Sequence, residues 1–281
     1  MREMRIAASL RHLLVKYAAQ YETREFLADD PSRFMHEVSG ERNREAVAFV
    51  ASGLSYGSRR QFMPKIARIQ EWADGDVDRW IRSGRFQKAF PADSLSPFYR
   101  FYRVGHMHSF LAAYREILLC HGSLGEAVAK SAGGNALGAI KEICRLFNGC
   151  GFSSPVVPAS PQSACKRIAM FLRWMVRDSS PVDLGLWADF IAKDSLIMPL
   201  DVHVLAESKR LGLMDSSSAS MAAALSLTET MRQIFPGDPL KGDFALFGYG
   251  VNKLEDDGRS AHGDAPRPQP SLLCRNSASL V

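Results

Sequence analysis

The chain has 281 residues, 46% of them hydrophobic and 10% aromatic, which is enough for one or two domains with buried cores. No stretch of about eighteen apolar residues occurs, so no membrane-spanning helix is predicted. The net charge of +5 favours nucleic acid or another polyanion as a partner. Five cysteines without paired spacing argue against a disulfide framework and a zinc ribbon. We therefore expect a cytoplasmic, monomeric protein without a metal or other cofactor.

Apolar residues recur at helical spacing through the first half of the chain. Residues 1 to about 27 fit one amphipathic helix, whose scattered charges do not fit a signal peptide. The sequence DDPSRF, residues 29–34, predicts a turn and the start of a new helix. Residues 44–72 predict a helix with one buried face and, after the break SYGSRR, another helix. The buried face consists of Ala46, Phe49, Val50, Gly53 and Leu54.

Two further segments, HSFLAAYREILLCHG and GNALGAIKEICRLFNGCG, have the same periodicity and end in glycine, as helices often do. Strand-like alternation is almost absent from the chain. The fold class predicted from these patterns is all-α.

Two proline-containing segments are not predicted to be helical. Residues 150–167, CGFSSPVVPASPQSACKR, contain three prolines and predict a rigid connector that leads into a helix from Ser163 to about Arg177. After Asn252 the proline, glycine and polar content is too high to support a core. We expect residues 253–281 to form a disordered tail.

The helix after the connector combines an apolar stripe with a row of cations. The stripe consists of Ile168, Phe171, Leu172 and Met175, and the row of Lys166, Arg173 and Arg177. Arg167 and Trp174 accompany the row; guanidinium groups contact phosphates, and an indole stacks on a base or a sugar. Lys166 lies in the first turn, where the helix dipole makes a cation slightly unfavourable. A surface helix with solvated charges is the simpler alternative.

The sequence LIMPLDVHVLAESKRLGL, residues 196–213, places an aspartate directly before a helix. Pro199 keeps the preceding residues out of that helix, so Asp201 is predicted to be its N-cap. His203 follows two residues later. It either takes an interior or capping position or has a role in the site. In DPLKGDFALFGYG, Lys241 and Asp243 precede an apolar helix, where they either cap it or line a pocket.

A lysine at one helix start and an aspartate in PLDVHV resemble the helix-hairpin-helix superfamily of base-excision DNA glycosylases. There the second segment usually has the sequence P-V-D-T-H-V, so Asp201 takes the place of the catalytic aspartate, Val202 replaces threonine, and Lys166 takes the place of the lysine. Over roughly residues 10–251 the chain is also similar to an uncharacterised bacterial family, DUF2400, which is related at a distance to the glycosylases. The motifs that carry this similarity are REAVAFVASGLSYG, FYRFY, SACKRIAMFLRWMVRD, VDLGLW, LIMPLDVHV and DPLKGDFALFGYG.

The resemblance implies a two-lobed helical fold of the glycosylase type. One lobe would combine residues 1–40 with 205–252, and residues 41–204 would form the central lobe, with Lys166 and Asp201 facing each other across the cleft. The implied function is excision of a damaged base, such as an oxidised purine, from DNA; RNA stays open as a partner. Lys166 would attack the anomeric carbon to form a Schiff base, and Asp201 would stabilise the positive charge on the sugar.

The chain departs from the glycosylase pattern in three places. The sequence VVPASPQSA stands where many glycosylases have a glycine-rich hairpin, L-P-G-V-G, that holds a DNA phosphate. Asp201 lies 35 positions after Lys166, a wider spacing than usual and closer to that of archaeal 8-oxoguanine glycosylases. The cysteine cluster that binds iron and sulfur in some members is missing, since Cys274 stands alone near the C-terminus. No iron–sulfur cluster is predicted.

Two other functions stay open. The chain can be a nucleic-acid binding protein that kept the fold without the chemistry, which predicts salt-sensitive binding without covalent trapping. It can also be an interaction protein whose basic helix meets an acidic partner, in which case DNA binding should not exceed what charge alone produces.

Overall fold

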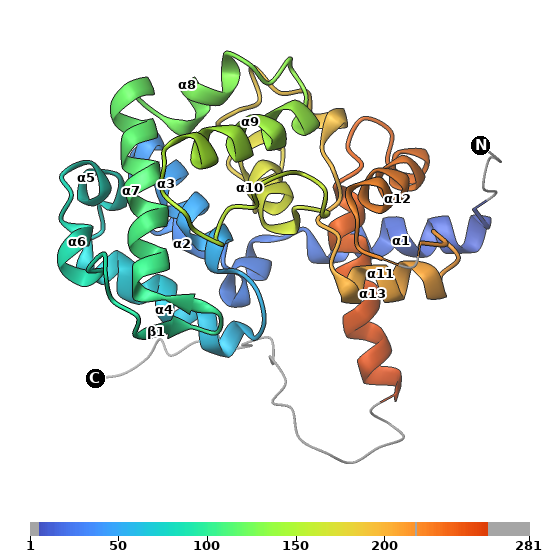
Figure 1. The fold of residues 1–281 in the computed structure, drawn as a ribbon. Helices are drawn as coiled ribbons and strands as arrows, with labels where there is room; N and C mark the ends of the chain where they lie inside the picture. Colours follow the sequence, from blue (N-terminus) through green and yellow to red (C-terminus); the bar gives the residue numbers. More distant parts are fainter. Residues whose placement is uncertain (1–5, 217, 258–281) are drawn as a thin grey trace, which may run out of the picture.

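A computed structural model describes residues 6–216 and 218–257. Its regular structure is almost entirely helical, which confirms the predicted all-α class (Figure 1). The helices up to residue 121 are α1 (Ala8–Tyr21), α2 (Arg33–His36), α3 (Glu41–Leu54), α4 (Arg59–Trp72), α5 (Val77–Arg82), α6 (Phe86–Ala89) and α7 (Val104–His121). The later helices are α8 (Leu124–Ala129), α9 (Ala136–Gly149), α10 (Lys166–Val176), α11 (Val202–Arg210), α12 (Met221–Ile234) and α13 (Lys241–Asp257). Short 3₁₀ turns span Arg24–Asp29 and Lys193–Ser195.

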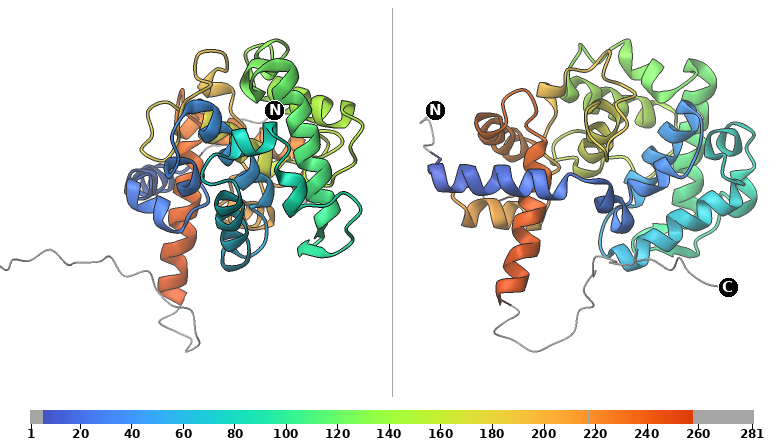
Figure 2. Two further views of the ribbon diagram at one scale, coloured as in Figure 1. Left: turned by 90° about the vertical axis from the view of Figure 1, so that its left-hand side faces the viewer. Right: turned by 180° about the vertical axis from the view of Figure 1, so that it is seen from behind.

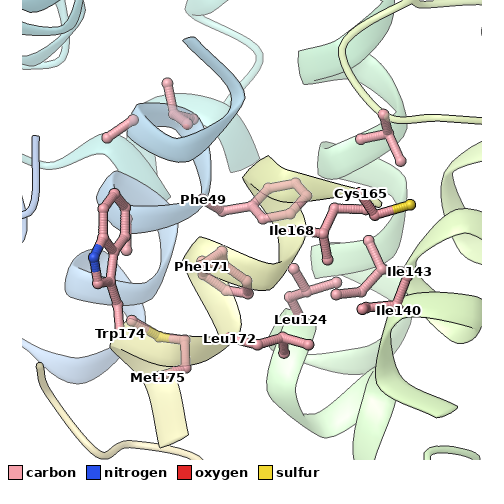
Figure 3. Packing of buried hydrophobic residues seen from close by; sticks show 14 of the residues in the cluster. Phe49, Leu124, Ile140, Ile143, Cys165, Ile168, Phe171, Leu172, Trp174 and Met175 are labelled. Atoms are coloured by element: carbon pink, nitrogen blue, oxygen red, sulfur yellow. The ribbon is translucent and has the colours of Figure 1, made fainter. Parts of the chain in front are cut away.

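Helix α3 lies at the centre of the core. Every residue from Glu45 to Leu54 is buried, because α2, α4, α5 and α10 all pack against this helix. In Figure 3 the Phe49 ring lies beside Phe171 of α10, and their centroids are 5.0 Å apart in an edge-to-face contact. A Cβ on Gly53 would lie 2.9 Å from a methyl group of Val156, so glycine lets the connector approach α3 closely.

Glu45 joins α3 to α8 and to the segment after α10. Its buried carboxylate accepts the backbone N–H groups of Leu124 at 2.8 Å and Gly125 at 3.0 Å, and the indole N–H of Trp187 at 3.0 Å. Burial raises the pKa of Glu45, and these three donors act against that rise. The Glu45 carboxylate therefore holds the start of α8 against α3. It also holds the segment around Trp187, which leads toward Asp201, against the same helix.

A two-stranded antiparallel hairpin is the local exception to the helical fold. Strand β1 (Pro97–Tyr99) pairs with β2 (Tyr102–Arg103), and the hairpin leads directly into α7. Hydrophobic and aromatic side chains from this segment pack against α4 and the end of α3, as the Tyr56–Tyr99 centroid distance of 4.9 Å illustrates. The hairpin lies at the edge of the part of the molecule that holds α4 (Figure 1).

The two ends of the described chain lie together. Helix α1 packs against α13, and α11 and α12 also contact α13. Figure 2 shows α1 and α13 crossing on one side of the molecule, away from α5 and α6. The proposed division into two lobes stays a prediction, but its border at residue 205 falls inside α11, which is one unbroken helix.

Several predicted boundaries need correction. The helix expected over residues 1–27 ends at Tyr21, and residues 1–5 lie outside the described part. Helix α10 begins at Lys166 instead of Ser163. The tail expected from residue 253 is helical as far as Asp257, and the rest of it, residues 258–281, lies outside the described residues. Within the described part, no helix has the length and apolar character needed to cross a bilayer.

Candidate active site

Lys166 and Asp201, 35 positions apart in the sequence, form an ion pair in the folded chain. The Nζ of Lys166 lies 2.8 Å from Oδ2 of Asp201. The lysine side chain is 35% exposed and the aspartate side chain 27% exposed, so solvent and a ligand can reach both. The pair brings an amine and a carboxylate together where two helices, α10 and α11, begin.

The connector places Lys166 at the first position of α10. Cys165 directly before it has a φ of 46°, a left-handed conformation that few residues other than glycine adopt and that turns the chain sharply into the helix. Ser163 pairs with Ser220 in an isolated antiparallel bridge, and the N–H of Ala164 donates to the carbonyl of Ala219. The end of the connector is therefore held against the segment just before α12.

A buried turn places Asp201 at the N-cap of α11, as the sequence predicted. Residues 196–200 are buried, and the backbone N–H of Met198 donates to the Thr228 hydroxyl at 2.9 Å. One carboxylate oxygen, Oδ1, accepts the N–H groups of His203 and Val204, both at 2.9 Å. The other oxygen, Oδ2, contacts Lys166. Capping occupies one oxygen of Asp201 and leaves the second for the lysine or a ligand.

The surroundings of Asp201 favour its ionised form. Burial acts to raise the pKa of Asp201, but the charge and hydrogen bond of Lys166 and the two backbone donors outweigh it, so the pKa is lowered. Asp201 therefore carries a negative charge throughout the neutral pH range.

The lowered pKa of Asp201 predicts a pH-dependent contribution to stability. In the folded protein the carboxylate holds a proton less tightly than in the unfolded chain, so its contribution is present above its usual pKa of 3.8 and is lost as pH falls through the lower folded value. Between about pH 5 and pH 3, the wild-type protein should lose more free energy of unfolding than Asp201→Asn. Urea denaturation of both proteins across this range measures the difference; parallel curves would contradict it.

Two of the residues predicted to line the site, His203 and Lys241, are exposed. Val202 is 68% exposed, and His203 is exposed and contributes its backbone N–H to the Asp201 cap. Lys241 is exposed at the start of α13. The site roles predicted for His203 and Lys241 stay predictions.

The predicted row of phosphate-binding arginines is wrong for Arg173 and Arg177. Only 3% of Arg173 and 1% of Arg177 is exposed, because α10 is covered on the side of the cations as well as on the side of its apolar stripe. Carboxylates of this chain, one of them fully buried and the others partly buried, neutralise both guanidinium groups. The partners of Arg173 are Asp183 and Asp243, and those of Arg177 are Glu22, Asp183 and Asp238.

Trp174 and Asp243 also have structural positions. Trp174 is completely buried, and Figure 3 shows it within the packed side chains of α10, so it does not offer a face for stacking on a base. Asp243 lies at the start of α13 as predicted, but its carboxylate contacts Arg173. This contact ties α13 to α10 and argues against the predicted pocket role of Asp243.

Arg167 belongs to an aromatic cluster that the sequence analysis did not identify. Its guanidinium donates to the Gly53 carbonyl at 2.7 Å and to the Tyr102 hydroxyl. It lies 5.5 Å from the centroid of the Tyr56 ring and 5.8 Å from that of Tyr102. The repeated aromatic–arginine pattern in FYRFYR is the sequence signal for this cluster, but its pairing with Arg167 depends on the fold. Arg167 thus ties the start of α10 to the hairpin.

Two small cavities lie in the described part of the chain, one of them beside α10. One of about 10 Å³ is lined by Gly53, Val156, Arg167 and Ile168 among others, and a second of about 10 Å³ lies beside Phe152 and Asn148. Each has room for about one water molecule. A nucleobase could enter the cavity beside α10 only if its lining side chains moved.

The cysteines of the described part are free thiols. The hydrogen bond from Cys144 lowers the pKa of Cys165 to about 7, and the same contact raises the pKa of Cys144. No group of three or more His, Cys, Asp or Glu side chains within the described residues is arranged to hold a metal ion.

A family model described as a protein of unknown function, DUF2400, matches residues 30–252. The chain belongs to this family. The matched region contains the connector, Lys166, Asp201 and the hairpin. No curated protein and no solved structure matches the chain.

Proposed function

We propose that this protein is a DNA glycosylase or abasic-site lyase that uses Lys166 as its nucleophile and Asp201 as an electrostatic stabiliser. The 2.8 Å contact between Nζ and Oδ2, in a position that a ligand can reach, is the observation that carries this proposal. The resemblance of PLDVHV and of the Lys166 helix start to the helix-hairpin-helix glycosylases supports it.

The chemistry begins with the neutral amine of Lys166. At an abasic site, once the Lys166 ammonium has given one proton to solvent, Nζ bonds to the aldehyde carbon C1′. The aldehyde oxygen then takes up one proton from Nζ and one from solvent and leaves as water, and an iminium ion, or Schiff base, forms. With a damaged base still attached, the same carbon loses the base together with the bonding electron pair, and the departing base takes up a proton. Positive charge develops on the sugar in both cases. The ionised Asp201, held by the helix N–H groups, lowers the energy of that charge.

The experiment that tests the proposal is reductive trapping on a duplex with an abasic site. Borohydride adds hydride to the iminium carbon and converts the transient adduct into a stable secondary amine. The wild-type protein should give an adduct visible as a band shift, and Lys166→Ala should give none. Duplexes with 8-oxoguanine or uracil then test for glycosylase activity.

Lys193→Ala is the matched control. Lys193 pairs with Asp178 at 2.8 Å and its side chain is 31% exposed, close to the values for Lys166. Trapping by Lys193→Ala should equal that of the wild type. Equal trapping by Lys166→Ala and wild type would refute the role of Lys166.

A non-catalytic nucleic-acid binding protein is the alternative that we propose. The small cavity beside Arg167 and Ile168 of α10 favours it, because this cavity has no room for a flipped base. It predicts tight, salt-dependent binding to DNA or RNA and no trapped adduct with any substrate.

A further inference from the structure

The hairpin carries a large aromatic side chain in solvent. Phe101 lies in the turn between β1 and β2 and is 80% exposed. Its neighbour Arg100 has a φ of 48°, a left-handed conformation that costs energy in a residue with a side chain. The turn keeps this conformation while it presents Phe101 to solvent. A two-residue turn between paired antiparallel strands requires such a positive φ, so the hairpin itself accounts for it.

The base of the hairpin is rigidly packed. The ring of Tyr56 contacts those of Tyr99 and Tyr102, with centroid distances of 4.9 and 5.1 Å. Tyr56 donates to the carbonyl of Tyr99 at 3.2 Å, and the Tyr99 hydroxyl donates to the carbonyl of Tyr56. Only 5% of Tyr99 and 4% of Tyr102 is exposed. Phe101 is therefore an exposed ring on a fixed support, which limits the entropy lost when it binds a partner.

The surface around Phe101 is cationic. Arg100 and Arg103 flank Phe101 in the sequence and are exposed, and the Arg100 guanidinium lies over the Tyr56 ring, 5.7 Å from its centroid. The hairpin residues 97–103 contain no carboxylate. Helix α4 packs against β1, and the Lys65 ammonium lies 5.2 Å from the Phe98 ring centroid. Arg60 and Arg68 on α4 are exposed as well. An exposed ring among cations matches the stacked bases and phosphates of a nucleic-acid strand, whereas an acidic protein surface would offer the ring no stacking partner.

A hydrogen bond joins the buried base of the hairpin to the start of α10, where the candidate site lies. Tyr102, next to Phe101, receives a hydrogen bond from Arg167, and Arg167 follows Lys166 at the start of α10. We infer that the hairpin tip is a DNA-binding contact in which Phe101 stacks on a base of the strand whose damaged nucleotide lies at Lys166, while Arg100 and Arg103 contact its phosphates. The choice of DNA as the partner rests on the proposed function. The contact itself rests on the exposed Phe101 ring and on the exposed Arg100 and Arg103.

Binding of a set of abasic duplexes, each with 2-aminopurine at a different position on either side of the abasic site, tests the contact. Phe101→Ala should weaken binding about tenfold, in the range measured for the loss of one base–aromatic stack. It should also remove the quenching of 2-aminopurine fluorescence that stacking on Phe101 causes. Phe101→Tyr keeps an aromatic ring and should restore both, and Phe101→Leu should restore neither fully. Substitutions at an 80% exposed position leave the core intact.

Leu119→Ala is the matched control. Leu119 is 51% exposed and lies near the far end of α7, which starts at the hairpin. Its substitution should change neither affinity nor quenching. Equal binding by Phe101→Ala and Leu119→Ala would overturn the inference, and tighter binding of an RNA strand of the same sequence would overturn the choice of DNA.

The test separates the two proposals. If Phe101→Ala weakens binding and removes quenching while no protein gives a trapped adduct, the contact stands and the lyase chemistry falls. If trapping depends on Lys166 and binding does not depend on Phe101, the lyase chemistry stands and the contact falls.

Discussion

Asp201→Asn should lower the rate of adduct formation about 10²- to 10³-fold, the loss typical of removing one preorganised electrostatic contact to a transition state. The substitution separates the two roles of this residue. Asparagine is as good an N-cap as aspartate, so the amide oxygen keeps the bonds to His203 and Val204. The negative charge opposite Lys166 is lost. Single-turnover trapping of wild type and Asp201→Asn on the same abasic duplex measures the effect.

The stability of Asp201→Asn supplies the control for this prediction. Because the lost ion pair is partly exposed, the free energy of unfolding at neutral pH should fall by less than about 1 kcal/mol. Asp201→Ala, which also loses the cap, should be less stable than Asp201→Asn by about 0.5–2 kcal/mol. A wild-type trapping rate in Asp201→Asn would mean that Asp201 is a helix cap and nothing more.

Arg177→Met should destabilise the protein by about 3–5 kcal/mol, the usual cost of removing one partner from a buried ion pair. Arg177 is 1% exposed and contacts Asp183 at 2.5 Å, Glu22 at 2.6 Å and Asp238 at 2.8 Å. Asp183 is fully buried, and this burial raises its pKa even beside two arginines. Without Arg177 the carboxylates lose their main counter-charge. Urea denaturation followed by circular dichroism measures the change.

An exposed ion pair provides the comparison for Arg177. Arg85 contacts Asp74 at 2.9 Å, but the two side chains are 57% and 73% exposed. Arg85→Met should therefore cost about 0–1 kcal/mol. Equal stability losses in Arg85→Met and Arg177→Met would contradict a structural role for the buried network and would reopen Arg177 as a ligand-binding residue.

From the sequence, the pairing of Lys166 with Asp201 could be predicted only through the resemblance to the helix-hairpin-helix glycosylases. Local rules predicted each residue separately: an aspartate N-cap behind Pro199, and a lysine at a helix start after a proline-rich connector. Nothing in the spacing of 35 positions brings the two side chains together. That contact depends on the bridge between Ser163 and Ser220 and on the packing of the 196–200 turn, which are long-range features.

The prediction that Arg173 and Arg177 form an exposed cationic row failed for a related reason. Helical periodicity correctly put Arg173 and Arg177 away from the apolar stripe, and exposure is the usual fate of such a face. The face is buried here because Asp183, Asp238 and Asp243 reach it from later parts of the chain. Periodicity reports which residues share a face and does not report whether another element covers that face.

Peptide mapping of the borohydride-reduced adduct by mass spectrometry tests the central claim most directly, because it identifies the amine that reacted. The wild-type protein should carry the DNA-derived mass on the peptide that contains Lys166, and on Lys166 itself after fragmentation. An adduct on another lysine or on the N-terminal amine would contradict the assignment. Complete absence of an adduct, together with tight binding of the same duplex, would leave a nucleic-acid binding protein without lyase chemistry.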